Sequence, residues 1–344
     1  MILVALLAVA LATFLILGYV LFIWWLDRYE REPIWLVGLT FLWGGLGGTC
    51  LSCVINSSIG AGAAQAFGAQ ASQFLTTVVV APTVEEVMKG LIFLPLLLIG
   101  NNIDNRTDGL IYGAATGLGF SCLENLWYYI NHFDPNNPEG LIMLVFLRTM
   151  FTSLVHCVSS ALLGMAIGYA RHRSGAFRWL LFPALGYAAA VINHGTWNFL
   201  ATLSGAFGQS ASALAGVTFL FGCLLVIGAS IMMFILTQLS LHSEHKFIRK
   251  YLLEEARRGI IPTAHADIIP YWRKRRRKDW LAPAVDKGAY IKAATLLAFR
   301  HRQLEIAKGE RHHQYMEDIT RYRNEVRKLL ARGGASAGNM ESGW

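Results

Sequence analysis

The sequence predicts an all-α protein, a polytopic bundle of about seven transmembrane helices followed by a basic, largely helical tail. Hydrophobic residues make up 54% of the 344 residues and charged residues only 15%, a balance typical of membrane proteins. The charge is also uneven, because residues 242–344 hold 22 basic and 12 acidic side chains whereas residues 1–241 hold 8 and 10. We therefore expect a transmembrane domain over residues 1–241 and a cytoplasmic tail over residues 242–344.

Seven apolar segments are long enough to cross a bilayer, which takes about 20 residues. They cover residues 2–26, 34–55, 74–99, 109–132, 141–170, 179–203 and 211–241. The connections after the first, third and fifth segments carry arginines, and those after the second, fourth and sixth carry neither Arg nor Lys. Because cytoplasmic loops are enriched in Lys and Arg, we expect the amino terminus outside and the carboxyl terminus in the cytoplasm. The uncharged stretch 57–73 is interpreted as a mobile outer loop.

Three ionisable residues lie inside the third apolar segment: Glu85, Glu86 and Lys89. Each costs about 2.5–3.5 kcal/mol at the centre of a membrane helix, so such residues usually face a polar interior and carry function. Lys89 lies four residues after Glu85 and three after Glu86, and both spacings permit an ion pair. One lysine cannot neutralise two glutamates, so a purely structural ion pair leaves one carboxylate unexplained.

Polar residues recur in the next three segments. They are Glu124, Asn125, Arg148, His156, His194 and Asn198. At 1.5 Å per helical residue, the glutamates and histidines of all four segments fall within roughly 12–23 Å of the outer surface. This shared depth predicts a single polar site built from four helices.

The residue types in this site suit hydrolysis of an amide bond. A buried glutamate can act as general base near neutral pH, a histidine can orient water or donate a proton, and an Asn amide can hydrogen-bond a developing oxyanion. Alternatively, Glu124, His156 and His194 could hold zinc, with Glu86 as base, in the two-His-one-Glu pattern of catalytic sites. We predict no cofactor. Zinc stays an open alternative without support from a motif, because the usual His-Glu-x-x-His helix is absent.

These motifs, in this order, resemble the PrsW family of intramembrane proteases, which is related to the CAAX-type prenyl proteases. The resemblance covers residues 74–203 and rests on Glu85-Glu86-x-x-Lys89, Phe120-x-x-x-Glu124-Asn125, His156 in the helix that Arg148 leads, and His194-x-x-x-Asn198. It implies a glutamate-dependent endopeptidase of the bacterial cytoplasmic membrane that cleaves a single-span, anti-sigma-factor-like membrane protein.

The resemblance also implies roles for the residues. Glu85 or Glu86 would activate water with help from Glu124, His194 and Asn198 would stabilise the oxyanion, and His156 would order the site. Lys89, Asn125 and Arg148 would support these groups. The sequence does not choose between the two adjacent glutamates, because their side chains point about 100° apart on a helix of unknown rotation.

A proton- or cation-coupled transporter is the alternative function, since it also needs buried carboxylates and histidines. Transporters usually contain internal repeats with paired broken helices, and this sequence has no evident repeat. A receptor or scaffold would explain the basic tail but not the polar site. Site chemistry therefore favours the protease.

The tail carries a polybasic segment, residues 273–278, between Trp272 and Trp280. Such a segment close to a membrane helix is expected to bind anionic lipid headgroups, and we expect no nucleic-acid partner. Residues 286–331 are predicted to form a helical hairpin, and residues 333–344 to be disordered.

Overall fold

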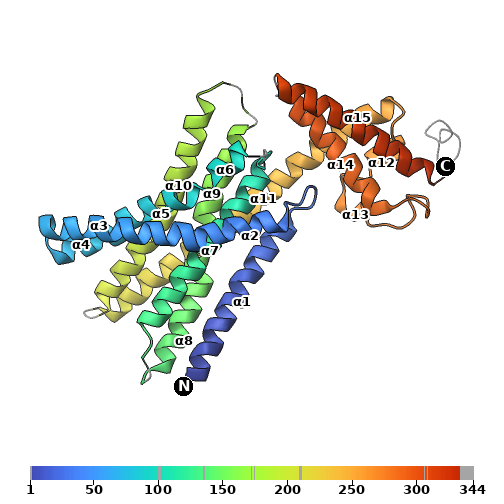
Figure 1. The fold of residues 1–344 in the computed structure, drawn as a ribbon. Helices are drawn as coiled ribbons and strands as arrows, with labels where there is room; N and C mark the ends of the chain where they lie inside the picture. Colours follow the sequence, from blue (N-terminus) through green and yellow to red (C-terminus); the bar gives the residue numbers. More distant parts are fainter. Residues whose placement is uncertain are drawn as a thin grey trace. The chain divides into compact units, whose positions relative to one another are not determined.

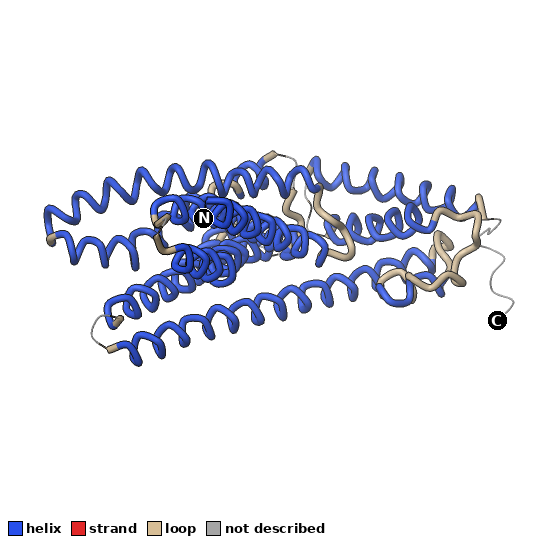
Figure 2. The backbone as a smooth tube through the Cα atoms, turned by 90° about the horizontal axis from the view of Figure 1, so that it is seen from below, coloured by secondary structure: helices blue, strands red, loops and turns tan. Residues whose placement is uncertain are grey.

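The structure, a computed structural model, describes residues 2–99, 102–134, 136–171, 173, 175–208, 211–305, 307 and 309–333. Over these residues every regular element is a helix, which confirms the predicted all-α class (Figures 1 and 2). The chain forms two compact units, one of residues 1–26 and 32–237 and the other of residues 27–31 and 238–344. The sequence-based boundary at residue 241 lies close to this division.

The first unit contains most of the helices. They are α1 (Ile2–Leu26), α2 (Ile34–Leu42), η1 (Trp43–Gly48), α3 (Thr49–Phe67), α4 (Ala69–Leu75), η2 (Thr76–Val80), α5 (Ala81–Gly90), α6 (Phe93–Leu98), α7 (Arg106–Asn131), α8 (Pro138–Leu147), η3 (Arg148–Thr152), α9 (Ser153–Arg171), α10 (Arg178–Phe207) and the first part of α11 (Ser212–Arg257), with η denoting a π-helical segment. The predicted loop at residues 57–73 is wrong. These residues belong to α3 and α4, which turn at Gly68 with φ +83°. Their many Ala and Gln residues favour a helix, and glycine adopts this φ without strain.

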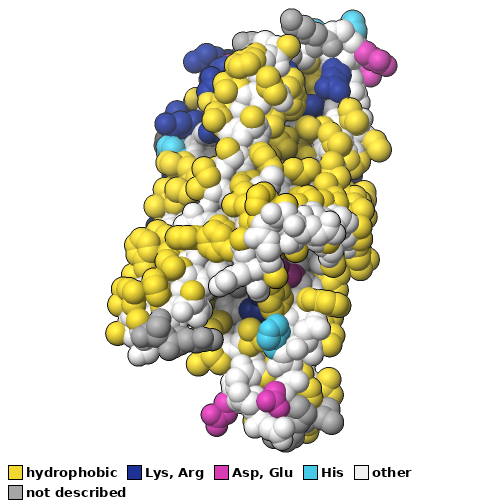
Figure 3. Space-filling model, turned by 90° about the vertical axis from the view of Figure 1, so that its left-hand side faces the viewer, with side chains coloured by type: hydrophobic (Ala, Val, Ile, Leu, Met, Phe, Trp, Pro, Cys, Tyr) yellow, Lys and Arg dark blue, Asp and Glu magenta, His cyan; other side chains and the backbone are white. Residues whose placement is uncertain are grey.

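Four helical runs are long and apolar enough to cross a membrane by length and composition: Leu6–Leu26, Ile34–Phe67, Pro138–Arg171 and Ser212–Arg257. Large hydrophobic side chains on them point outward, including Phe14 and Val54, which are 72% and 67% exposed. Figure 3 shows hydrophobic side chains over most of one face. An apolar exterior of this kind suits contact with lipid rather than water. The count of seven spans and their orientation stay predictions.

Helix α7 lies at the centre of the first unit and packs most extensively against α9. The two backbones approach closely because glycines line the contact. A Cβ atom added to Gly117 would lie 2.1 Å from the carbonyl oxygen of His156, and one added to Gly109 would lie 2.0 Å from that of Gly164. Small residues permit such approaches between membrane helices. The packing therefore holds the His156 segment of α9 directly against α7.

Two π-helical segments lead into helices that carry predicted site residues. Segment η2 precedes α5, which bears the glutamate pair, and η3 contains Arg148 and precedes α9. Pro82 lies in the first turn of α5, where its missing N–H is tolerated. Single π-helical turns occur often at functional sites, and here they set the rotation of α5 and α9 about their axes.

The second unit contains the end of α11, α12 (Thr263–Ala266), α13 (Trp272–Arg275), α14 (Lys287–Leu304) and α15 (Glu310–Ala331). Its core includes Ile248, Leu252, Tyr290 and Val326. Helices α14 and α15 pack together over the stretch where the sequence predicts a hairpin. Residues 334–344, expected to be disordered, lie outside the described residues.

Candidate active site

Four helices bring the predicted glutamates and histidines into one buried cluster. Helix α5 supplies Glu85, Glu86 and Lys89, α7 supplies Glu124, α9 supplies His156 and α10 supplies His194. The imidazole rings of His156 and His194 meet edge to face with their centroids 4.6 Å apart. The glutamates and histidines that residue counting placed at a similar membrane depth therefore lie in one cluster, and the two histidine rings are in contact.

Glu86 is completely buried, and its oxygens have several partners. The Lys89 ammonium lies 2.5 Å from Oε1, and Nδ1 of His194 lies 3.0 Å from the same atom. The Ser160 hydroxyl donates to Oε2 at 3.2 Å. Because a carboxylate only accepts, the neutral His194 donates its proton from Nδ1, which leaves the lone pair on Nε2. Glu86 thus fixes both the tautomer and the orientation of His194.

His156 lies between a cation and an anion. The Lys89 ammonium donates to Nδ1 at 3.2 Å, since a lysine has no lone pair to offer. The opposite nitrogen, Nε2, then carries the proton and donates to Oε2 of Glu124 at 3.0 Å. Arg148 donates to Glu124 at 2.7 Å and to Asn125 at 2.8 Å. Both nitrogens of His156 are therefore engaged, and Glu124 is neutralised by an arginine.

Glu85 is held more loosely than the other two glutamates. The Asn56 amide lies 3.4 Å from Oε1, a long hydrogen bond, whereas the buried Oε2 has no hydrogen-bond partner among the described residues. Oε2 lies 3.8 Å from Nε2 of His194. This separation is too long for a direct hydrogen bond but allows one small species to contact both atoms.

The same three side chains form the group most suited to a metal ion. Ligand atoms of Glu85, His156 and His194 all lie within 4.8 Å of one another. Two imidazoles and a carboxylate match a catalytic zinc site, and the unpartnered Oε2 of Glu85 fits a missing ligand. The donor set therefore fits zinc, with Glu85 in the place that the sequence analysis gave to Glu124.

Asn198 has a different surrounding from the other predicted residues. Its amide donates to the carbonyl oxygen of Thr77 in η2 at 3.0 Å. Asn198 lies one helical turn after His194 on α10, and one of its two N–H groups is used by this hydrogen bond. Its contact links α10 to the segment that precedes the glutamate pair.

Sequence reasoning missed two residues that touch the carboxylates. Ser160 lies four residues after His156, so helical spacing places both on one face of α9 and could have revealed it. Asn56 lies just beyond the end of the predicted span 34–55, directly before the stretch interpreted as a loop, and had no such signal. The carboxylate cluster therefore also includes residues from α3 and the middle of α9.

Comparisons with known proteins agree with the resemblance inferred from the motifs. A protein named Protease PrsW from Bacillus subtilis (strain 168) is 24% identical over 51% of this chain and 74% of its own length. Proteins of the same name from Oceanobacillus iheyensis and Clostridioides difficile are 27% and 31% identical, over 34% and 30% of this chain and 49% and 42% of theirs. No solved structure matches the chain. The model of the PrsW family of intramembrane metalloproteases matches residues 32–239, which is more than half of the chain and includes the whole cluster, so this chain belongs to that family.

Proposed function

We propose that the protein hydrolyses a peptide bond of a single-span membrane protein, with Glu85 as the general base. The observation that carries this proposal is that Oε2 of Glu85 has no hydrogen-bond partner in the described part of the chain and lies 3.8 Å from Nε2 of His194. A water molecule placed between them could give one proton to the carboxylate. Family membership supports membrane peptidase activity as the reaction class.

The reaction would proceed by attack of water on the scissile carbonyl carbon. Glu85 takes the water proton as the oxygen attacks, and the same proton then passes to the leaving amine nitrogen as the C–N bond breaks. Glu86 keeps His194 in one tautomer, and Arg148 and His156 keep Glu124 ionised and fixed. The second N–H of Asn198 is the proposed donor to the oxyanion, whereas Nε2 of His194, whose proton lies on Nδ1, accepts a hydrogen bond from the attacking water.

Zinc is the alternative source of activated water. Glu85, His156 and His194 would hold the ion, and zinc would supply a polarised carbonyl and a nucleophile at neutral pH. His156 would first have to give up its hydrogen bonds, because Lys89 and Glu124 now occupy both of its nitrogens. Binding of zinc would therefore replace these hydrogen bonds of His156.

The location and partners of the protein are part of the proposal. We place it in the bacterial cytoplasmic membrane with its carboxyl terminus in the cytoplasm, where an anti-sigma-factor-like protein is the proposed substrate. Within residues 273–278, all but Arg275 are exposed and available to anionic lipid headgroups. Arg275 instead donates to the carbonyl oxygen of Arg28 in the same unit.

The decisive experiment compares new protein amino termini in native-host membranes that contain either wild type or Glu85→Gln. Termini within or beside a membrane span that appear only with wild type would establish the protease and identify its substrate. Identical profiles from equally abundant, folded proteins would refute the proposed hydrolysis and direct attention to ion flux.

The metal is tested on the same preparations. Elemental analysis of active wild type and of His194→Ala distinguishes the two mechanisms. About one equivalent of zinc that is lost in His194→Ala would establish the zinc mechanism, whereas an active wild-type preparation without zinc would exclude it.

A further inference from the structure

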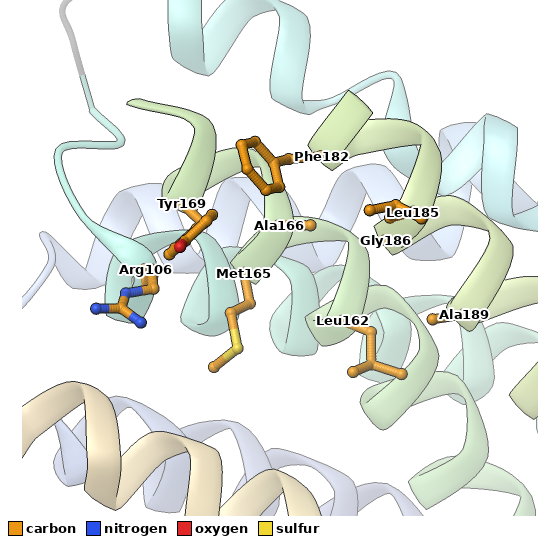
Figure 4. Close-up of a pocket in the computed structure, with 9 residues that line it drawn as sticks. All are labelled: Arg106, Leu162, Met165, Ala166, Tyr169, Phe182, Leu185, Gly186 and Ala189. Atoms are coloured by element: carbon orange, nitrogen blue, oxygen red, sulfur yellow. The ribbon is translucent and has the colours of Figure 1, made fainter. Parts of the chain in front are cut away.

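A groove between α9 and α10 lies outside the buried cluster. Its cavity volume is about 280 Å³, and aliphatic side chains of both helices line most of it (Figure 4). Leu162 and Ala166 lie on one side, and Leu185 and Ala189 on the other. Gly186 brings the two helices together, since an added Cβ atom would lie 2.5 Å from Cβ of Ala166. The groove is therefore a formed feature of the helix packing.

One end of the groove is basic and aromatic. The guanidinium carbon of Arg106, at the start of α7, lies 5.1 Å from the ring centroid of Tyr169, and that of Arg173 lies 4.6 Å from it. The two guanidinium carbons are therefore less than 10 Å apart. Phe182 packs edge-on against the same Tyr169 ring, with centroids 4.7 Å apart. A planar guanidinium group can donate two parallel N–H hydrogen bonds to two oxygens of one phosphate.

We propose that this groove binds one anionic phospholipid, with the phosphate at Arg106 and Arg173 and one acyl chain between α9 and α10. The ligand must be anionic at one end and apolar along the rest, which describes a phospholipid. Both arginines lie in connections that the basic-residue pattern assigns to one membrane face, at the level of lipid headgroups.

Size distinguishes a lipid from the transmembrane helix of another protein. A three-turn helix about 10 Å wide and 16 Å long occupies about 1,200 Å³, roughly four times the volume of the groove. An extended acyl chain is far thinner and fits between two helices. A free phosphate, in contrast, would leave the aliphatic part of the groove without a ligand. The proposal does not rest on the proposed peptidase activity, because no groove residue belongs to the carboxylate cluster.

The test uses full-length protein in neutral detergent, with its tail intact. Native mass spectrometry and the thermal unfolding midpoint report binding of phosphatidylglycerol, of phosphatidylcholine with the same acyl chains, and of glycerol phosphate. Wild type should retain one phosphatidylglycerol about tenfold more tightly than phosphatidylcholine. Arg106→Gln/Arg173→Gln should lose this one tightly held phosphatidylglycerol, whereas any anionic lipid held at residues 273–278 should be unaffected. The matched control is Arg171→Gln/Arg178→Gln. It removes two charges from the two ends of the connection between α9 and α10 and should keep the preference for phosphatidylglycerol.

A second variant tests the aliphatic part of the groove. Ala189→Phe fills the groove and should reduce retention of phosphatidylglycerol about tenfold, while glycerol phosphate should not stabilise even wild type. Equal retention by wild type and the Arg106/Arg173 variant would overturn the proposal. Stabilisation by glycerol phosphate equal to that by the lipid would also overturn it, as would binding of an acidic-flanked transmembrane peptide that phosphatidylglycerol fails to displace. The glycerol phosphate and displacement measurements use wild type, so they stand even where Ala189→Phe fails to fold.

Discussion

Each of the two units contains an ionic cluster around a completely buried glutamate, Glu86 in the first and Glu255 in the second, and the difference between these clusters separates function from stability. In the second unit, the fully buried Glu255 receives two hydrogen bonds from Arg323 at 2.6 and 2.7 Å, with Arg258 and His301 each 3.0 Å away. One carboxylate thus has two arginines and an imidazole. In the first unit, three carboxylates share Lys89 and Arg148 as their cations.

The first cluster therefore carries a surplus negative charge when its histidines are neutral, and the surplus resides on Glu85. A buried carboxylate that lacks partners reduces the stability of the folded state. We therefore expect a proton, a metal ion or a substrate to provide the missing partner. Burial of a carboxylate alone does not indicate a site, because Glu255 is as completely buried as Glu86. The informative feature is incomplete pairing.

The largest expected effect comes from the two adjacent glutamates. Glu85→Gln should reduce cleavage about 10²–10⁴-fold through loss of the general base. The unfolding midpoint should stay nearly unchanged, because no described residue forms a hydrogen bond with Oε2 of Glu85. Glu86→Gln should also abolish cleavage but lower stability by about 3–5 kcal/mol, since it leaves the buried Lys89 without its carboxylate. Cleavage assays and thermal unfolding of both variants in one detergent check this. Normal cleavage by Glu85→Gln would reject Glu85 as the base.

In the second unit, the same substitution should affect stability alone. Glu255→Gln should destabilise that unit by about 3–4 kcal/mol, because Arg323 loses its bidentate partner, while cleavage continues at the wild-type rate. The control is Glu305→Gln, which breaks an exposed pair with Lys250 and should cost less than about 1 kcal/mol. Protease-susceptibility measurements on the tail report the local stability. Equal effects of the two substitutions would show that burial of the pair is irrelevant.

His265, a buried histidine that forms no ion pair with a described residue, gives a third case. His265 packs against Trp280, contacts the Tyr290 hydroxyl at 2.9 Å, and burial lowers its pKa from 6.5 to about 4. The folded state favours the neutral imidazole. The contribution of His265 to the free energy of unfolding is therefore complete above pH 6.5 and is lost as the pH falls toward 4. Between pH 8 and 5 wild type should lose about 2 kcal/mol more stability than His265→Gln. Identical pH profiles from unfolding titrations would contradict this origin.

The sequence predicted the helical class and the glutamates and histidines of the cluster because both depend on local information. Hydrophobic run lengths identify membrane helices, and charged residues inside such runs are rare enough to stand out. The family of the chain was recognised from the same residues, and the match over residues 32–239 confirms it.

The details that depend on helix rotation could not be predicted. The π-helical segments η2 and η3 rotate α5 and α9 by amounts that residue counting does not contain. The sequence therefore left Glu85 and Glu86 undistinguished and grouped Glu124, rather than Glu85, with the histidines as metal ligands. Asn56 escaped notice because its helix continues through a stretch that lacked a long apolar run.

The smallest expected effect concerns the Ser160 hydroxyl, which donates a hydrogen bond to Glu86. Ser160→Ala removes one hydrogen bond of 3.2 Å to Oε2 and should cost about 1 kcal/mol of stability and a few-fold in kcat, with KM unchanged, because Glu86 orients His194 rather than the substrate. Ser159→Ala is the matched control, since the neighbouring hydroxyl accepts from Asn193 at 2.8 Å and makes no contact with a described carboxylate. It should cost similar stability and leave kcat unchanged. Equal losses of kcat in the two variants would mean that packing of α9, and not the partners of Glu86, controls the rate. A loss of kcat confined to Ser160→Ala would show that the hydrogen bond to Glu86 affects the rate at which the neighbouring Glu85 acts as general base.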